Sequence, residues 1–210
     1  YMTSPYETLL EIIREKNIVR VGFEGDFVTY DVYSKLTDIL VDFYLIAVQL
    51  DGLRMVKDNE EISAIKKAVA IADQAFSHIL SYMKPGITEH DIKVELEYQM
   101  AKLGAEKPAF DTIVASGKRG ALPHGRASSK VIESGDLVTM DFGAVYQGYH
   151  SDITRTVCIG KATERQREIY EIVLTAQLAG VQAVVPGKLG KEIDAVAREV
   201  IIDAGFGDCF

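Results

Sequence analysis

Apolar residues recur along this chain at two different spacings, and each spacing predicts a different kind of element. From Ile62 to Met83 they return every three or four positions, which is typical of a helix with one buried face. From Leu137 to Val157 they alternate with polar residues, which is typical of β-strands. The dipeptide Gln147-Gly148 lies in the middle of the second stretch, where glycine favours a tight turn. The pattern therefore predicts a long helix and a β-hairpin.

Short polar signals set the limits of the remaining elements. Thr88 with Asp91, and Thr163 with Gln166, have the spacing of a capping box, which satisfies backbone N–H groups at the start of a helix. Proline and glycine end the helices that precede or follow these boxes. The expected order is helix, helix, strand, glycine-rich loop, hairpin and helix, at residues 58–84, 88–104, 110–115, 116–126, 137–157 and 163–185.

The first 56 residues form a separate, smaller α/β pattern. They contain two predicted helices, one clear strand and two short apolar runs, at 5–16, 32–40, 19–24, 43–48 and 53–56. So few strands do not make a stable sheet, and the piece is small for an independent core. We therefore expect 1–56 to be the end of a longer N-terminal domain and 57–210 to belong to a second domain. The polar segment 57–61, at the start of the second domain, marks the boundary.

The second domain repeats itself at a constant offset of 101 residues. The matching features are a Pro-Gly pair, an acidic residue followed by isoleucine, and a glycine, at 85–86 and 186–187, 91–92 and 192–193, and 104 and 205. Several aligned positions favour a duplicated α/β unit over a chance match. The first copy continues into the strand, loop and hairpin, whereas only 206–210 follow the second. We therefore expect the second repeat to be incomplete in this chain.

Two aspartates interrupt the alternation of the hairpin, although aspartate is a poor strand residue. If the turn is centred on Gln147-Gly148, Asp141 lies opposite Thr154 and Asp152 becomes its diagonal neighbour on the same polar face. A loop with an odd number of residues would send Asp152 to the other face. The placement of the two carboxylates therefore depends on the register of the hairpin.

Two carboxylates brought this close repel each other, so one must bind a proton or both must bind a cation. A pair of divalent ions is a recurrent partner in hydrolytic enzymes. A hairpin whose Asp and Thr residues simply face water fits the same pattern equally well. His150 is a candidate third ligand because it has the same parity as Asp152, but a position at the end of a hairpin favours a surface residue.

Composition excludes several classes of protein. A net charge of −8 over 210 residues argues against a nucleic-acid-binding protein, and 48% hydrophobic residues are enough for a sizeable core. The two cysteines, Cys158 and Cys209, are far apart and suggest neither a disulfide framework nor a zinc–thiolate site. No apolar run is long enough to span a membrane, and no signal-peptide pattern is present. A cytoplasmic location is the expectation.

Three features together resemble a known family. They are ALPHGRAS at 121–128, LVTMDFGAVYQGYHSDITRTV at 137–157, and the helix pairs around 85–86 and 186–187. In this order they are similar to the Xaa-Pro aminopeptidase and prolidase branch of the metallopeptidases with the pita-bread fold. The resemblance implies an α/β fold with an internal pseudo-twofold repeat, preceded by the end of a creatinase-type N-terminal domain. It also implies that the chain is truncated at both ends.

The same resemblance assigns roles to four residues. It implies two divalent ions, manganese first and cobalt or zinc next, with Asp141 and Asp152 among their ligands. His124 matches a histidine that binds substrate or assists proton transfer, and Thr154 matches a group that supports a metal ligand. A lone loop histidine is usually a surface residue, but the flanking proline and glycine favour a fixed presentation. The family's remaining histidine and two glutamates are expected beyond Phe210, so we expect these 210 residues alone to be inactive.

The function that follows is metal-dependent hydrolysis of the peptide bond between an N-terminal residue and proline. The expected partner is a proline-containing peptide, with neither nucleic acid nor membrane involved, and a homodimer is compatible with the resemblance. Two alternatives remain: a non-catalytic binding module with the same fold, and a creatinase-type hydrolase of a C–N bond outside peptides. The first is disfavoured by the presence of both Asp141 and Asp152.

Overall fold

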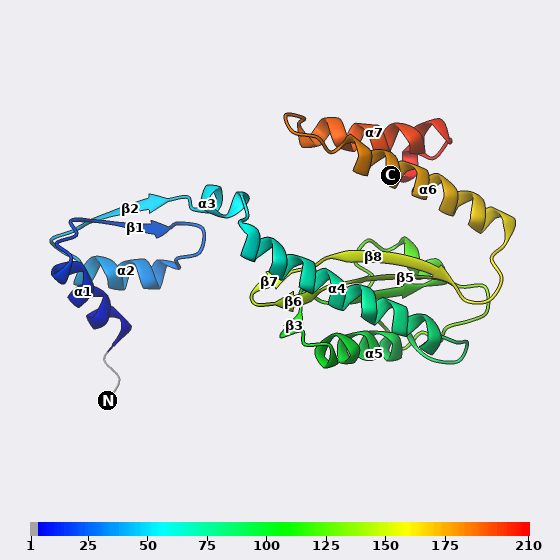
Figure 1. Ribbon diagram of the computed structural model, residues 1–210, viewed down its shortest axis with the longest axis horizontal. Coiled ribbons are helices and arrows are strands. Elements are labelled where there is room, and N and C mark those ends of the chain that lie inside the picture. The colour runs from blue at the N-terminus through cyan, green and yellow to red at the C-terminus, as the bar shows by residue number, and fades with distance from the viewer. Residues whose placement is uncertain (1–3) are drawn as a thin grey trace. The chain divides into compact units, whose positions relative to one another are not determined.

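The computed structural model describes residues 4–210, which form two compact units divided between Asn59 and Glu60 (Figure 1). Each unit has its own helices and strands. Within 4–210, no helix has both the length and the apolar character that a bilayer-spanning segment requires.

The first unit is a small α/β arrangement built on two parallel strands. β1 pairs with β2 from Arg20 opposite Tyr44 to Glu24 opposite Val48. Its elements are α1 (Pro5–Glu15), β1 (Arg20–Glu24), α2 (Tyr30–Ile39), β2 (Tyr44–Val48) and α3 (Asp51–Met55). The predicted helices and the first strand are confirmed to within two residues, and the last apolar run proves to be the short helix α3.

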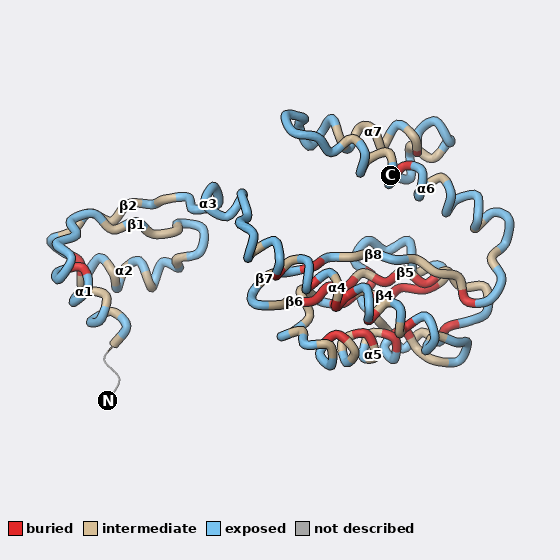
Figure 2. The backbone as a smooth tube through the Cα atoms, in the orientation of Figure 1, coloured by how far each residue is buried: buried red, intermediate tan, exposed pale blue. Residues whose placement is uncertain are grey.

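The core of the second unit lies between two helices and the adjacent sheet. α4 (Asn59–Tyr82) and α5 (Glu89–Lys102) each bury one face, and the predicted capping box of Thr88 and Asp91 is present at the start of α5. Figure 2 shows the buried residues concentrated on α4, α5 and strands β4 (Ile113–Ser116) and β5 (Leu137–Phe142). Large side chains that are completely buried include Ile71, Ile79, Ile92, Leu96, Val138, Met140 and Phe142.

The strands of this unit form two three-stranded antiparallel sheets, ordered β4-β5-β8 and β3-β6-β7. The predicted strand at 110–115 starts later than expected and is β4. The elements between α5 and α6 are β3 (Lys107–Pro108), β4 (Ile113–Ser116), the 3-10 helix η1 (Gly117–Ala121), β5 (Leu137–Phe142), β6 (Ala144–Tyr146), β7 (Tyr149–His150) and β8 (Ile153–Cys158).

The predicted hairpin is present, but it is bent so that its two halves belong to different sheets. Its turn is centred on Gln147 and Gly148, both of which have positive φ angles, 50° and 77°. The register continues through the bend, because Tyr146 pairs with Tyr149 and Asp141 pairs with Thr154. The bend was not predicted.

Close backbone contact forms the bend. A Cβ atom on Gly143 would overlap the carbonyl oxygen of Ser151 and would lie 3.1 Å from the Cβ of Ala109. The hydroxyl of Ser151 is buried there and donates to the carbonyl of Ala68 on α4 over 3.1 Å. Only glycine allows the two strands of the hairpin to approach this closely at residue 143.

The predicted repeat is confirmed in the helices that follow. α6 (Glu164–Ala183) opens with the expected capping box of Thr163 and Gln166, and it packs against α7 (Gly190–Asp203), which leads to η2 (Gly207–Cys209). Both ends of α7 are displaced from those of α5 by the 101-residue offset, as is the end of α6 from that of α4. The two helix pairs therefore correspond at these ends, whereas α6 starts later than the offset from α4 would place it.

Candidate metal centre and its histidine loop

Asp141 and Asp152 are brought together where the hairpin bends. Asp141 lies in β5 and Asp152 directly precedes β8, and the pairing of Asp141 with Thr154 has the predicted register. Partial burial raises the pKa of Asp152, and the neighbouring Asp141 carboxyl raises that pKa further. The two carboxyl groups therefore face each other, and the alternative of an odd loop is excluded.

Threonines line the same face of the sheet. The hydroxyl of Thr154 donates to Oδ1 of Asp141 over 3.0 Å, which orients that carboxyl group. Next along the strands, the hydroxyls of Thr139 and Thr156 are 3.0 Å apart and share a hydrogen bond. The predicted polar face of the hairpin is therefore formed, while alternate residues of β5 face the core.

The carboxylate oxygens on this face are suitable ligands for a divalent cation. The described residues, however, supply too few ligands to complete its coordination. Facing carboxylates are the oxygen ligands that hard divalent ions prefer, and a cation would relieve their repulsion. Among residues 4–210, no group of three or more His, Cys, Asp and Glu side chains gathers in a way that could hold a metal. His150 is exposed on β7 and adds no third ligand.

His124 is carried over this face by the segment that links β4 to β5. A Cβ on Gly120 would lie 3.7 Å from the hydroxyl oxygen of Thr139, so the segment crosses the polar face of β5. Ile113 pairs with Asp141 on one side and forms a bridge to Arg126 on the other. Two strand spacings, about 10 Å, therefore separate the backbones of Arg126 and Asp141. His124, which is exposed, lies two residues before Arg126 in this segment.

Glu89, at the start of α5, is a site residue that the sequence did not predict. Its side chain is completely buried and accepts hydrogen bonds from Ser116, Arg119 and Ser128. Burial pushes the pKa of Glu89 upward most strongly, but the hydrogen bonds from the two serines and the charge of Arg119 together outweigh it, so the net pKa is lowered. Nothing in the local sequence distinguishes it from an exposed glutamate in a first helical turn.

The lowered pKa of Glu89 predicts a loss of stability in acid. Because the folded state binds fewer protons at this site than the unfolded state, its contribution is fully present above the ordinary glutamate pKa of about 4.3 and falls as the pH drops through and below that value. We expect Glu89→Gln to unfold at lower urea concentration than the wild type at pH 7, with the difference shrinking below about pH 4. Urea titrations from pH 7 to pH 3 measure it. A difference that stays constant over this range would contradict the assignment.

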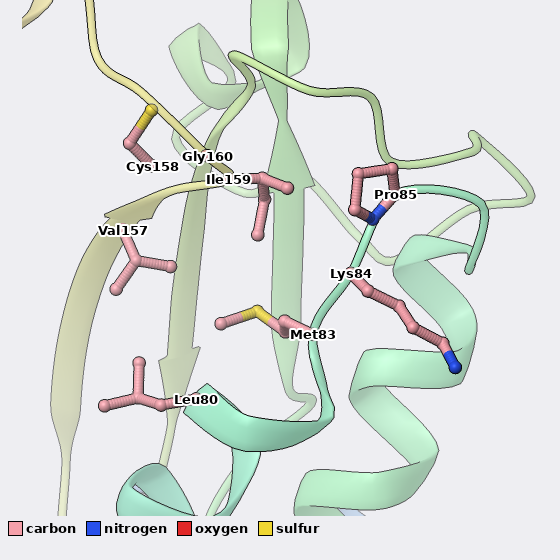
Figure 3. A pocket seen from close by; sticks show the side chains of 8 residues that line it. All are labelled: Leu80, Met83, Lys84, Pro85, Val157, Cys158, Ile159 and Gly160. Carbon is pink, nitrogen blue, oxygen red and sulfur yellow. The ribbon is translucent and has the colours of Figure 1, made fainter.

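A hollow in the second unit lies apart from this site. It has a volume of about 280 Å³ and lies between the end of α4 and the end of β8 (Figure 3). It is lined by Leu80, Met83, Lys84, Pro85, Val157, Cys158, Ile159 and Gly160. Val157 packs against the hydrophobic core, on the opposite face of β8 from the threonine hydroxyls, so this hollow does not open toward Asp152.

The chain is similar to known proteins in both sequence and structure. Residues 63–210 match the model of metallopeptidase family M24. The chain is 48% identical over 97% of its length to the uncharacterized peptidase YqhT of Bacillus subtilis, and 46% identical over 98% to an Xaa-Pro dipeptidase of Pyrococcus furiosus. It superposes with a TM-score of 0.94 on an X-Pro aminopeptidase of Thermotoga maritima, at 40% identity over 99% of the chain.

The chain spans 58% and 59% of the lengths of these two curated relatives, and 59% of the Thermotoga structure. Its repeated helix pairs and bent hairpin are those of the pita-bread fold of these enzymes, as the resemblance implied. A family match over more than half of the chain, together with relatives at nearly half identity, settles the classification. The chain belongs to metallopeptidase family M24.

Proposed function

We propose that the protein carrying this chain hydrolyses the peptide bond between an N-terminal residue and proline, with divalent metal ions held partly by Asp141 and Asp152. The observation that carries the proposal is the pair of facing carboxyl groups, in which partial burial and the neighbouring Asp141 both raise the pKa of Asp152. The dipeptidase and aminopeptidase names of two relatives support the substrate class.

Each residue of the site has a role that follows from its position. Asp141 and Asp152 would hold the metal, and the Thr154 hydroxyl would fix one oxygen of Asp141 so that the other is directed to the ion. When bound, divalent ions supply a polarised carbonyl and a water of lowered pKa. His124, exposed on its loop, can bind substrate or assist proton transfer, because a histidine side chain can both donate and accept a hydrogen bond.

Manganese is the metal we propose first, with cobalt or zinc as alternatives. Carboxylates are hard oxygen ligands, which suit manganese better than softer sites do. Since only two carboxylates converge within residues 4–210, we expect these 210 residues alone to bind manganese weakly and to lack peptidase activity. Calorimetry of the 210-residue chain with manganese tests the first expectation, and tight stoichiometric binding would contradict it.

An assay on the protein that carries these residues tests the proposed function directly. Release of the N-terminal amino acid from an Xaa-Pro dipeptide and from a longer Xaa-Pro peptide would be followed with added manganese. Cleavage that a chelator stops and manganese restores is the expected result. Peptides in which alanine replaces proline control for specificity. Cleavage of neither Xaa-Pro peptide, in protein shown to be folded and loaded with metal, would reject the proposal.

Removing the hydroxyl of Thr154 should weaken the metal centre without unfolding the chain. Groups that orient metal ligands typically contribute 10–100-fold to metal affinity or activity, so we expect Thr154→Val to lose about that much. Thr156→Val is the matched control, because its hydroxyl bonds Thr139 instead of an aspartate. Metal titrations of both variants measure the difference. Equal losses of metal affinity in the two variants would show that the Thr154 hydroxyl has no specific effect on the metal centre, and that both substitutions act by disturbing β8.

A further inference from the structure

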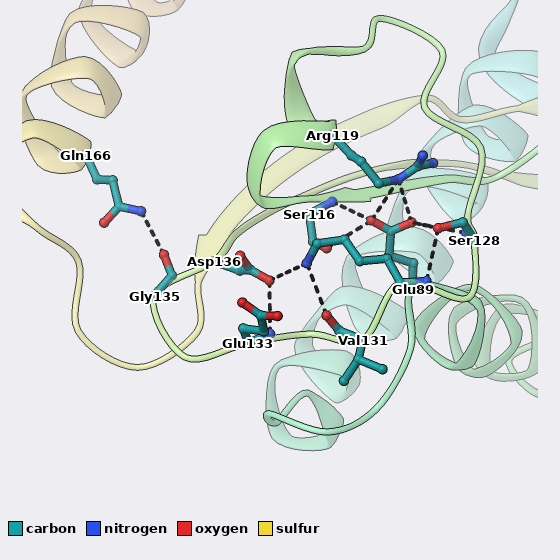
Figure 4. A network of polar contacts seen from close by, with 10 residues as sticks. Glu89, Ser116, Arg119, Ser128, Val131, Glu133, Gly135, Asp136 and Gln166 are labelled. Atoms are coloured by element: carbon teal, nitrogen blue, oxygen red, sulfur yellow. Dashed lines mark hydrogen bonds and ion pairs between the residues drawn. The ribbon is translucent and has the colours of Figure 1, made fainter.

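One carboxylate, that of Glu89, closes both ends of the segment that carries His124. Ser116, the last residue of β4, donates to Oε1 of Glu89 from its backbone N–H and its hydroxyl, over 2.8 and 2.9 Å. Ser128, on the far side of the segment, donates to Oε2 in the same two ways, over 3.1 and 2.7 Å. Figure 4 shows the two serines on either side of the Glu89 carboxylate. Residues 117–127 are therefore a loop whose two ends are tied to a single side chain.

Arg119, near the start of the same loop, binds the same carboxylate. Its Nε donates to both carboxylate oxygens of Glu89, over 3.3 and 3.1 Å (Figure 4). Its terminal nitrogen donates to the carbonyl of Arg126 over 2.7 Å. The guanidinium group thus links the start of the loop to the backbone of Arg126, two residues after His124. The same guanidinium group therefore contacts both the Glu89 carboxylate and the backbone at residue 126.

The backbone around His124 leaves it little freedom once these ties are made. The N–H of Arg126 donates to the carbonyl of His124 over 2.9 Å, and the N–H of Gly125 donates to that of Leu122 over 3.2 Å. Gly125 is buried against β4, where an added Cβ would lie 2.8 Å from the Cβ of Ala115. The histidine therefore projects from a tight turn that is fixed to the sheet on one side and to Glu89 on the other.

The cost of burying Glu89 sets it apart from ordinary core residues. It is the only fully buried carboxylate among residues 4–210, and a buried charge is costly unless it is paired and hydrogen-bonded. Its position at the start of α5 adds the favourable field of a helix N-terminus. An apolar residue could fill the same volume, but it could not accept hydrogen bonds from three places in the loop. The Glu89 carboxylate can therefore hold the loop in one conformation, which an apolar side chain could not do.

From these contacts we propose that Glu89 is a positioning residue, which anchors the loop 117–127 and so holds His124 over the polar face of β5. Glu89 acts through Ser116, Arg119 and Ser128 and touches neither aspartate. The anchoring itself concerns only the structure of the loop. Its consequence for turnover rests on the proposed function, in which His124 binds substrate or assists proton transfer.

Hydrogen exchange tests the anchoring without any assay of activity. In the protein that carries this chain, Glu89→Gln should speed amide exchange in 117–127 by about tenfold or more, while exchange in 71–79 and 138–142 stays unchanged, because the lost bonds belong to the loop and not to the core. Glu97→Gln is the matched control, since its carboxylate lies on the same helix and pairs with Lys93 at 3.7 Å. Uniform acceleration, or none, would overturn the proposal.

A second variant keeps the exchange test decisive if Glu89→Gln does not fold. Ser128→Ala removes one hydroxyl donor at 2.7 Å and leaves the charge pair of Glu89 and Arg119 in place. It should give a smaller acceleration confined to the loop 117–127. Acceleration spread over 71–79 and 138–142, or no acceleration in the loop, would count against the anchoring as it would for Glu89→Gln.

A double-mutant cycle then separates positioning of His124 from general stabilisation. Glu89→Gln should lower kcat/KM for an Xaa-Pro peptide in the wild type, but it should change kcat/KM less than about twofold when His124 is already alanine, because residues acting through one another are not additive. Independent, additive losses would reject the positioning role. If the protein cleaves no Xaa-Pro peptide, the proposed function fails, whereas loop exchange still decides whether Glu89 anchors the loop.

Discussion

Gly143→Ala should lower the free energy of unfolding by about 3 kcal/mol or prevent folding, which places it among the most damaging single substitutions available in the second unit. The added Cβ would overlap the carbonyl oxygen of Ser151, and backbone atoms cannot move aside as the end of a side chain can. To remove this overlap, the hairpin would have to open at its bend. Since Asp152 directly follows Ser151, the same movement would separate it from Asp141.

Urea denaturation followed by circular dichroism measures this effect. Gly190→Ala is the matched control: Gly190 is the first residue of α7, and no heavy atom lies within 4 Å of an added Cβ there. Alanine in place of glycine in a helix is neutral or stabilising by up to about 1 kcal/mol. A Gly143→Ala protein as stable as Gly190→Ala would show that the bend does not need the close approach.

Asp152→Asn should abolish activity while leaving the metal-free protein as stable as the wild type or slightly more stable. Loss of a direct ligand should cost at least the roughly 100-fold that loss of a supporting group can cost, so we expect kcat/KM to fall by about 100-fold or more. Stability should be equal or slightly higher, because the substitution removes a carboxylate whose pKa is raised by partial burial and, second, by the neighbouring Asp141. An arrangement that is unfavourable without a cation is what a metal site requires.

The measurements for Asp152→Asn are peptidase assays with added manganese and thermal unfolding in the presence of chelator. Asp73→Asn controls for loss of an acidic residue, because Asp73 is exposed on α4. Unchanged cleavage by Asp152→Asn would remove that residue from the metal centre. A marked fall in its metal-free stability would show instead that the aspartate stabilises the fold.

The parts of the site that were predictable depend on neighbours in the sequence. Gln147-Gly148 fixes a turn with two positive φ angles, and every pairing along the hairpin, including that of Asp141 with Thr154, follows from where that turn lies. The helix starts were predictable for the same reason, since a capping box is complete within four residues. Strand alternation then assigned the buried and polar faces of β5.

The parts that were not predictable depend on contacts between distant segments. The partners of Glu89 lie 27 to 39 residues further along the chain, and no local pattern marks a glutamate that will be buried. The bend at Gly143 requires the contact with Ser151 and the hydrogen bond from Ser151 to α4, which only the folded chain brings together. Strand β4 began late because the residues just before it link two small sheets, so the apolar run at 110–115 is not one continuous strand.

The duplicated helices allow the chain to be compared with itself. At the 101-residue offset, Glu89 of α5 corresponds to Gly190 of α7, and the capping residue Thr88 corresponds to Leu189. The second copy therefore keeps the helix but has no side chain where the first has its buried carboxylate. Two helices that share one architecture therefore differ at this position. The anchor is a property of one copy of the helix and not of the architecture that the two copies share.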